Sequence, residues 1–222
     1  MPMGKISCVL FDLDGTLIDT NQLIIDSFQY TLKHHLGLDV PTAEIALTFG
    51  RPLVDILRGY SADKADEMVH TYREYNEARH DTTTKLIPGV KETLSELEAA
   101  GITLGVVTGK RRQLALRGLS LFGLDAYMAV VVTPEDTREH KPHPAPVLKA
   151  LELLGEQPEH TVMVGDSSLD LACARAAGTY TAAVWWSVVS HKLLLAEKPD
   201  FIFHRMTELI DICLPSGKAA RA

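Results

Sequence analysis

The sequence predicts an α/β fold, with a Rossmann-like doubly wound parallel sheet and an all-α helical cap inserted after the first strand. Two observations lead to this prediction. Short apolar segments of strand length alternate with helical segments over most of the chain, which is typical of a parallel sheet covered on both faces. The first and second strands are separated by about 65 residues that have helical patterns and no convincing strand.

Each expected element follows from the spacing of apolar residues and from the glycines that end helices. Near-continuous apolar runs predict strands over 6–11, 102–107, 128–132, 161–164 and 181–185. Helical spacing predicts four helices before residue 85, over 21–36, 42–49, 52–58 and 64–79. Four more are predicted after it, over 90–100, 111–122, 145–154 and 169–177. Glycines directly follow several of these helices, as expected at helix C-termini.

The position of the helical block predicts the domain organisation. We expect a core domain formed by residues 1–18 and 86–222, and a helical cap domain formed by residues 19–85. A chain of 222 residues is long enough to bury a substantial core and to carry such an insertion.

Composition narrows the possible partners and the compartment. The net charge of −7 provides no general attraction to nucleic acid or to an anionic membrane, so neither partner is expected. The three cysteines are far apart in sequence and lie in apolar surroundings, which indicates reduced thiols. The first strand begins too early to leave room for a signal peptide, and no apolar run has the length of a membrane span. We therefore expect a cytoplasmic protein.

Polar residues with chemical potential follow four of the predicted strands. They are Asp12 and Asp14 after the first strand, Thr108-Gly109-Lys110 after the second, Lys141 after the third, and Asp166 with Asp170 after the fourth. Ligands of open parallel sheets bind at the carboxyl ends of the strands. We therefore expect all four sets to meet at one edge of the sheet.

The four aspartates together require positive charge. Buried carboxylates repel one another unless a cation compensates them, and Mg²⁺ prefers carboxylate and phosphate oxygens. Lys141, held among prolines in His140-Lys141-Pro142-His143-Pro144, is placed to supply further positive charge and to bind a phosphate oxygen. A hydroxyl and free backbone N–H groups at Thr108 and Gly109 are suited to phosphate.

These motifs resemble those of the haloacid-dehalogenase-like phosphatase superfamily. The segment Asp12-Leu13-Asp14-Gly15-Thr16-Leu17-Ile18-Asp19 matches the first motif, D-x-D-G-T-[LV]-[IV]-D, at every position. A strand ending in Thr108 resembles the second motif, and the K-P-x-P setting of Lys141 resembles the third. The resemblance implies that Asp12 is the nucleophile, which forms an aspartyl-phosphate, and that Asp14 is the general acid and base.

The same resemblance leads to a hypothesis for the metal site. Mg²⁺ would be bound by Asp12, by the backbone carbonyl of Asp14 and by Asp166. Asp170 lies one turn further along and would support the site through metal-bound water or through Lys141.

The helical insertion directly after the first motif resembles the type 1 cap subfamily, which includes phosphoglycolate phosphatases, β-phosphoglucomutases and inorganic pyrophosphatases. The stretches that resemble the pyrophosphatases most are 72–76 with 80–81, 146–151, and 178–186 with 198–200. The resemblance implies a phosphohydrolase, monomeric or a small homo-oligomer, that acts on a small anionic phosphate, with inorganic pyrophosphate as the expected substrate. The alternatives are a phosphoglycolate phosphatase, a sugar phosphomutase and a non-catalytic regulatory binding protein.

Specificity is expected to come from the cap. Arg51 lies between two predicted cap helices, where its guanidinium could hold a second phosphate or a carboxylate. The alternative is an ordinary surface arginine. Arg79, His80 and Lys110 are weaker candidates for the same role.

Overall fold

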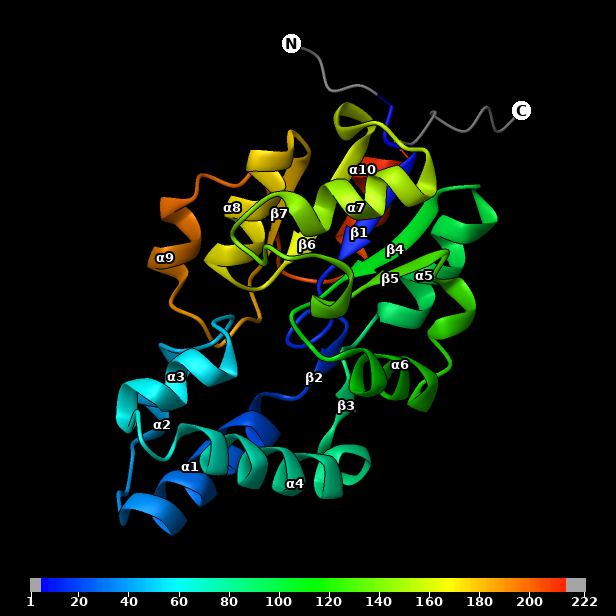
Figure 1. The fold of residues 1–222 in the computed structure, drawn as a ribbon. Helices are drawn as coiled ribbons and strands as arrows, with labels where there is room; N and C mark the ends of the chain where they lie inside the picture. The colour runs from blue at the N-terminus through cyan, green and yellow to red at the C-terminus, as the bar shows by residue number, and fades with distance from the viewer. Residues whose placement is uncertain (1–4, 215–222) are drawn as a thin grey trace, which may run out of the picture.

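The computed structural model describes residues 5–214, and its main feature is a six-stranded parallel sheet (Figure 1). The strand order is β5-β4-β1-β6-β7-β8. The strands are β1 (Cys8–Phe11), β4 (Thr103–Val107), β5 (Val130–Val132), β6 (Thr161–Gly165), β7 (Tyr180–Val184) and β8 (Phe201–Phe203). The predicted α/β architecture is confirmed.

Helices cover both faces of this sheet. They are α5 (Val90–Ala99), α6 (Arg112–Leu121), α7 (Ala145–Leu154), α8 (Ser168–Ala177), α9 (His191–Ala196) and α10 (Glu208–Cys213). Alternate residues of β1 point to opposite faces, as strand geometry requires. Cys8 and Leu10 pack in the cluster formed with α7 and α8, whereas Val9 and Phe11 pack in the cluster formed with α5, α6 and α10. The first strand is therefore buried on both sides, which explains its continuous apolar sequence.

Four helices lie between the first and second strands of the sheet and pack around a core of their own. They are α1 (Asn21–Leu36), α2 (Thr42–Ala46), α3 (Leu53–Tyr60) and α4 (Ala65–Thr83). The two chain segments that join this block to the sheet pair as a short antiparallel ribbon, β2 (Ile18–Asp19) with β3 (Lys85–Leu86). In Figure 1 the block lies below the sheet, beyond the carboxyl end of β1.

Several element boundaries differ from the sequence prediction. Helix α2 ends at Ala46 rather than at residue 49, and α4 continues to Thr83 rather than ending near Arg79. The ribbon of β2 and β3 was missed because two-residue strands leave no detectable alternation. Strand β8 and helices α9 and α10 were also missed, since each has only three to six residues. Residues 5–214 also contain three short 3₁₀ turns, η1 (Asp125–Tyr127), η2 (Pro134–Asp136) and η3 (Pro158–His160).

The sheet topology determines where the polar residues meet. Strand β1 pairs in parallel with β4 on one side and with β6 on the other, so the chain segments that follow these three strands emerge side by side. A strand-order reversal of this kind creates a crevice at the carboxyl ends. Within residues 5–214 no helix combines the length and apolarity needed to cross a membrane.

Candidate active site

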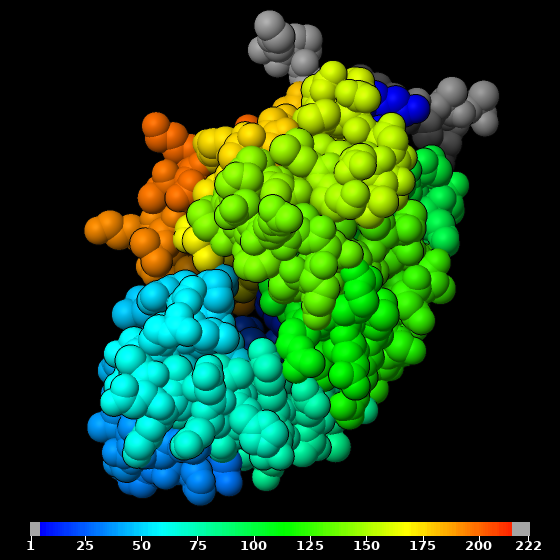
Figure 2. Space-filling model, viewed as in Figure 1, coloured from blue at the N-terminus to red at the C-terminus, as the bar shows by residue number. Residues whose placement is uncertain are grey.

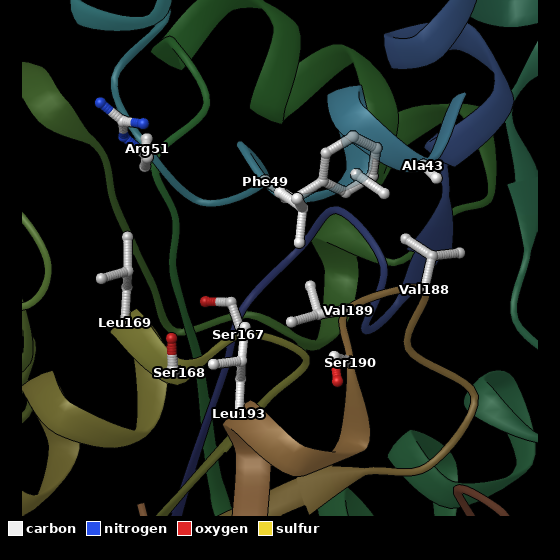
Figure 3. Close-up of a pocket in the computed structure, with 12 residues that line it drawn as sticks. Ala43, Phe49, Arg51, Ser167, Ser168, Leu169, Val188, Val189, Ser190 and Leu193 are labelled. Atoms are coloured by element: carbon white, nitrogen blue, oxygen red, sulfur yellow. The ribbon is translucent and has the colours of Figure 1, made fainter. Parts of the chain in front are cut away.

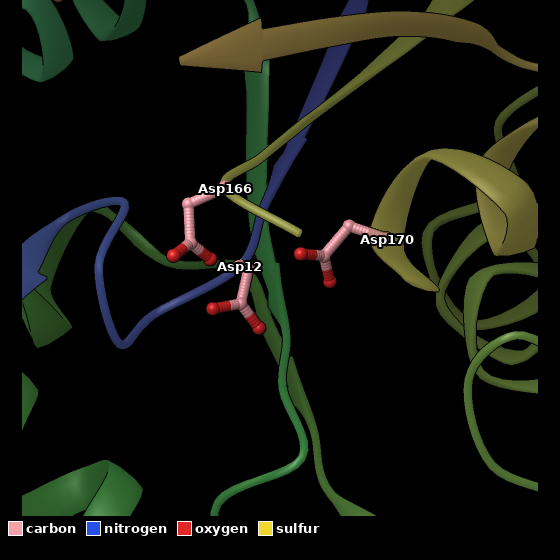
Figure 4. Close-up of side chains that lie close together, drawn as sticks. All are labelled: Asp12, Asp166 and Asp170. Carbon is pink, nitrogen blue, oxygen red and sulfur yellow. The ribbon is translucent and has the colours of Figure 1, made fainter. Parts of the chain in front are cut away.

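Three buried aspartates meet at the carboxyl edge of the sheet (Figure 4). Asp12 follows β1, Asp166 follows β6, and Asp170 lies in the first turn of α8. One carboxylate oxygen from each lies within 4.8 Å of the other two. All three residues are at most 7% exposed. Oxygen atoms at this spacing, from carboxylates, are a suitable ligand set for a divalent cation.

Lys141 inserts its ammonium group between two of these carboxylates. Its Nζ lies 2.8 Å from Asp12 Oδ1 and 2.5 Å from Asp170 Oδ1, and it also donates to the carbonyl oxygen of Val107 at 2.6 Å. Three acceptors therefore use all three ammonium protons. The ammonium is held in one position, and the sequence-based expectation that Lys141 lies beside Asp12 agrees with this geometry.

Asp170 serves mainly to hold Lys141 and the start of α8. Its Oδ2 accepts hydrogen bonds from the backbone N–H of Ser167 at 3.0 Å and from the Ser167 hydroxyl at 2.6 Å. The Ser167 hydroxyl in turn accepts from the Asp170 N–H, which completes a capping box. With Lys141 on its other oxygen, Asp170 already has donors on both oxygens.

The negative charge of the three carboxylates is not fully compensated by the side chains around them. Desolvation raises the pKa of Asp12 to about 7, although Lys141 acts in the opposite direction. Desolvation and the neighbouring carboxylates also raise the pKa of Asp166 well above its usual value. Among residues 5–214 no donor hydrogen-bonds the Asp166 carboxylate, so one buried carboxylate of the three has no compensating partner. The donor set therefore fits Mg²⁺, with Asp12 and Asp166 as the side chains that would bind it.

Gly15 allows the loop after β1 to pass directly beside Asp166. Its φ is +82°, a left-handed conformation that favours glycine, and a Cβ added there would lie 2.3 Å from Asp166 Oδ2. Its carbonyl accepts a hydrogen bond from Trp186 Nε1 at 3.0 Å. The Ser187 hydroxyl donates to the Asp166 carbonyl at 2.6 Å. The segment after β7 thus fixes both loops.

We expect Gly15→Ala to lower the phosphate-release activity more than the same substitution at a glycine whose added Cβ would not contact Asp166. Gly37, at the end of α1, is the matched control, because its φ is +67° and nothing lies within 4 Å of an added Cβ. Both variants should lose roughly 1 kcal/mol of stability from backbone strain. Only Gly15→Ala must displace Asp166. In a titration of phosphate release against Mg²⁺, only this variant should therefore need a higher Mg²⁺ concentration for half-maximal activity. Equal Mg²⁺ dependence in the two variants would contradict a metal role for Asp166.

Asp14 lies outside the three-carboxylate group and has partners of its own. Its Oδ1 accepts from Lys110 Nζ at 2.7 Å and from the Thr20 hydroxyl at 2.7 Å. Lys110 was only a weak candidate from the sequence, yet it is the side chain that pairs with Asp14. Asp14 therefore differs from Asp12 in environment, being more exposed and bound to a different lysine. The expected role of its backbone carbonyl at the metal stays a prediction.

Thr108 and Gly109 follow β4 at the same edge. Thr108 is buried, and its hydroxyl oxygen accepts from the Lys110 backbone N–H at 3.1 Å. The hydroxyl proton remains available as a donor. A Cβ built on Gly109 would meet no atom within 4 Å, so neighbouring atoms do not cover this side of the backbone. Phosphate binding by these two residues stays a prediction.

Arg51 lines a pocket between the helical block and the segments after β6 and β7, rather than the carboxylate group (Figure 3). The pocket measures about 360 Å³ and includes Ser167 and Ser168, the residues directly after Asp166. In Figure 3 the guanidinium extends away from these serines. Figure 2 shows a hollow between the cap helices and the core, with atoms of the N-terminal segment at its bottom. The substrate role of Arg51 stays a prediction.

The two other weak candidates have contacts within the helical block. The guanidinium of Arg79 stacks over the ring of Tyr75, 3.8 Å from its centroid. His80 is fully buried, and its Nδ1 lies 2.9 Å from Asp81 Oδ1, while Asp81 is also paired with Arg117 of α6. Burial lowers the pKa of His80. Neither side chain hydrogen-bonds a carboxylate of the site among the described residues.

Sequence reasoning missed Trp186 and Ser187 as residues that fix the site. The rule that identified the other loops, polar residues directly after a strand, applies equally to Ser187 after β7. The signal is weak there, because no acidic or basic side chain follows this strand within residues 185–190.

Comparison with known proteins identifies the family. The sequence model of the haloacid dehalogenase-like hydrolases matches residues 9–184, which include all four predicted motifs. The chain belongs to this family. The match confirms the sequence-based expectation of a haloacid-dehalogenase-like phosphatase.

Individual relatives of this family cover almost the whole chain. A protein of Caldanaerobacter subterraneus subsp. tengcongensis, provisionally named pyrophosphatase PpaX, is 53% identical over 94% of this chain and 94% of its own. Pyrophosphatase PpaX of Bacillus mycoides is 43% identical over 94% of this chain and 97% of its own. The crystal structure of a Bacteroides fragilis protein, provisionally named a haloacid dehalogenase-like hydrolase, covers 93% of this chain and 100% of its own, at 29% identity and a TM-score of 0.86.

Proposed function

We propose that this haloacid-dehalogenase-like hydrolase cleaves inorganic pyrophosphate in a Mg²⁺-dependent reaction that passes through an aspartyl-phosphate on Asp12. The observation that carries the chemistry is the buried Asp12 carboxylate, which has Lys141 on one side and the donor-free Asp166 on the other. The substrate assignment is supported by the names of the relatives that match the chain over nearly its full length.

The two aspartates of the first motif have different roles in this proposal. Asp12 attacks the phosphorus atom in line, displaces the leaving phosphate and keeps the transferred phosphoryl group on its carboxylate. Lys141 holds the attacking carboxylate in place and stabilises charge on the phosphoryl oxygens. When bound by Asp12 and Asp166, Mg²⁺ would reduce the repulsion between the carboxylate and the phosphate.

Asp14 transfers the protons. It donates a proton to the leaving oxygen, and then accepts one from the water that attacks the aspartyl-phosphate on phosphorus. This attack releases the second phosphate and restores Asp12. Lys110 and Thr20 both donate to Asp14 Oδ1, so within residues 5–214 no side chain occupies Oδ2, the oxygen that would carry the proton.

The proposal is tested by phosphate release with and without Mg²⁺ from pyrophosphate, 2-phosphoglycolate and sugar phosphates at equal concentrations. We expect release from pyrophosphate to exceed the others and to require Mg²⁺. Preference for 2-phosphoglycolate would show that the substrate assignment is wrong, but it would be consistent with the proposed aspartyl-phosphate mechanism. Release from none of them would contradict the proposed function, and phosphate transfer between the two positions of a sugar phosphate would favour a mutase.

We expect the affinity for Mg²⁺ to rise with pH. With its pKa raised to about 7, metal-free Asp12 keeps a proton that must leave when Mg²⁺ binds. In the metal-free protein, this carboxyl lowers stability as pH rises from about 4 to about 7, because the unfolded chain releases its proton earlier. Asp166, the other proposed ligand, also has a raised pKa, so the Mg²⁺ dissociation constant should fall by at least about tenfold per pH unit below pH 7 and less steeply above it.

Isothermal titration calorimetry in two buffers of different ionisation enthalpy measures both the affinity and the protons released. Near pH 6 we expect one to two protons released per Mg²⁺ bound, from Asp12 and Asp166, and a smaller number near pH 8. Affinity that does not change with pH would show that Mg²⁺ does not bind to Asp12.

A further inference from the structure

The two buried lysines of the site differ in how many of their protons are used. Lys141 has three acceptors for its three protons. The Lys110 side chain is only 9% exposed, yet among residues 5–214 its ammonium has one acceptor, Asp14 Oδ1. An ammonium group has three donors, so two protons of Lys110 have no protein partner.

The backbone fixes where this incompletely paired ammonium lies. The Lys110 N–H donates to the Thr108 hydroxyl, which holds the turn directly after β4. Strand β4 is the neighbour of β1, so the turn lies beside the loop that carries Asp14. A largely buried lysine with a single protein partner is well placed to hydrogen-bond an anionic ligand, which would complete its hydrogen bonding. The two open protons therefore indicate a second, anionic partner.

The position of that partner follows from the role of Asp14. The leaving group must contact Asp14 to receive a proton, and Lys110 Nζ is 2.7 Å from the same carboxylate. An oxygen that hydrogen-bonds Asp14 is therefore separated from the ammonium only by the Asp14 carboxylate, within reach of a second oxygen of the same leaving group. Lys141, in contrast, lies on the nucleophile side and has no proton to spare.

We propose that Lys110 binds the negative charge of the leaving group and so selects substrates whose leaving group is itself an anion. This inference rests on the proposed function, since it uses Asp14 as the acid. For pyrophosphate the anion is the departing phosphate, and for 2-phosphoglycolate it is the carboxylate. Monoesters with uncharged leaving groups gain nothing from Lys110.

The test compares Lys110→Met with wild type on two substrates whose leaving groups have similar basicity. These are pyrophosphate, with an anionic leaving group, and 4-nitrophenyl phosphate, whose leaving group has no additional anionic substituent. We expect kcat/KM for pyrophosphate to fall about 100-fold, as for loss of a buried charge partner, and kcat/KM for 4-nitrophenyl phosphate to change much less. Lys110→Arg keeps the charge and should retain most of the preference for pyrophosphate.

A control variant and a check of folding show whether the effect is specific to Lys110. Lys91→Met removes an exposed lysine on α5 and should leave both substrates unaffected. Thermal unfolding and circular dichroism of Lys110→Met report whether it folds, and Lys110→Gln, which also removes the charge but stays polar, carries the test if it does not. Equal losses on both substrates would overturn the inference, because Lys110 would then act only through Asp14.

Failure of the proposed substrate gives a different result. If the wild-type protein cleaves 2-phosphoglycolate but not pyrophosphate, the proposed function is wrong. The effect of Lys110→Met is then compared between 2-phosphoglycolate and 4-nitrophenyl phosphate. A selective loss there would still support the role of Lys110. A wild-type enzyme that prefers uncharged leaving groups would overturn it.

Discussion

Replacing Asp12 by asparagine is expected to lower kcat by about 10⁴-fold or more while leaving the fold intact. Asparagine has nearly the same shape, but its amide is a very poor nucleophile and cannot form the aspartyl-phosphate. The substitution also removes one of three mutually repelling buried carboxylates. Lys141 keeps Asp170 and the Val107 carbonyl as acceptors, so we expect the free energy of unfolding to change by no more than about 1 kcal/mol.

Two measurements make this prediction decisive. Asp63→Asn removes an exposed carboxylate of the cap and should retain wild-type kcat, which controls for the chemical change itself. In Asp14→Asn, hydrolysis of the intermediate lacks its base, so acid-quenched enzyme should carry a phosphoryl group on the peptide that contains Asp12. Substantial turnover by Asp12→Asn, or a phosphoryl group on another peptide, would assign the nucleophile elsewhere.

Sequence patterns predicted the sheet and the convergence of the site well, and the reasons are physical. Strand β1 is buried on both faces, so its sequence is almost purely apolar, and the change to Asp12 marks the end of the strand clearly. Parallel strands bring their carboxyl ends to one edge whatever their order. This is why Asp12, Lys141, Asp166 and Asp170 could be grouped without knowing that β1 lies between β4 and β6.

The sequence was less informative about which lysine pairs with which aspartate. Lys110 and Lys141 both follow strands, and only strand order and loop direction bring Lys110 to Asp14 and Lys141 to Asp12. The rigid proline setting of Lys141 drew attention to it, whereas Lys110 has no comparable local signal. The direction of Arg51 was equally inaccessible, because an exposed side chain on a turn is not constrained by any periodic pattern.

Lys141→Met is expected to destabilise the protein and to reduce activity, in contrast to Asp12→Asn. Methionine retains an unbranched apolar side chain of similar length but leaves Asp12 and Asp170 buried and facing each other without a cation. Removing one partner of a buried ion pair costs about 3–5 kcal/mol. Neighbouring carboxylates raise the pKa of Lys141 above its usual value, so the ammonium is fully charged at neutral pH and its whole contribution is lost.

The loss of unfolding free energy in Lys141→Met should depend on pH and on Mg²⁺, whereas a loss caused by altered packing would depend on neither. Chemical denaturation at pH 6 should show a smaller loss than at pH 8, because protonation of Asp12 then relieves the repulsion. Saturating Mg²⁺ should restore part of the stability, since the metal neutralises the same carboxylates. Activity should stay reduced by about 10³-fold even with saturating Mg²⁺, because the positive charge that Lys141 places beside the phosphoryl oxygens is missing.

Lys91→Met again serves as the control, because it makes the same chemical change on the exposed surface of α5. It should show neither the pH dependence nor the Mg²⁺ response. If Lys141→Met were destabilised equally at pH 6 and pH 8, its effect would come from altered packing, and Lys141 would not be the counter-charge of Asp12. Repulsion between buried carboxylates would then have to be balanced by Mg²⁺ alone, and the metal-free protein would unfold more readily with rising pH whether or not Lys141 was present.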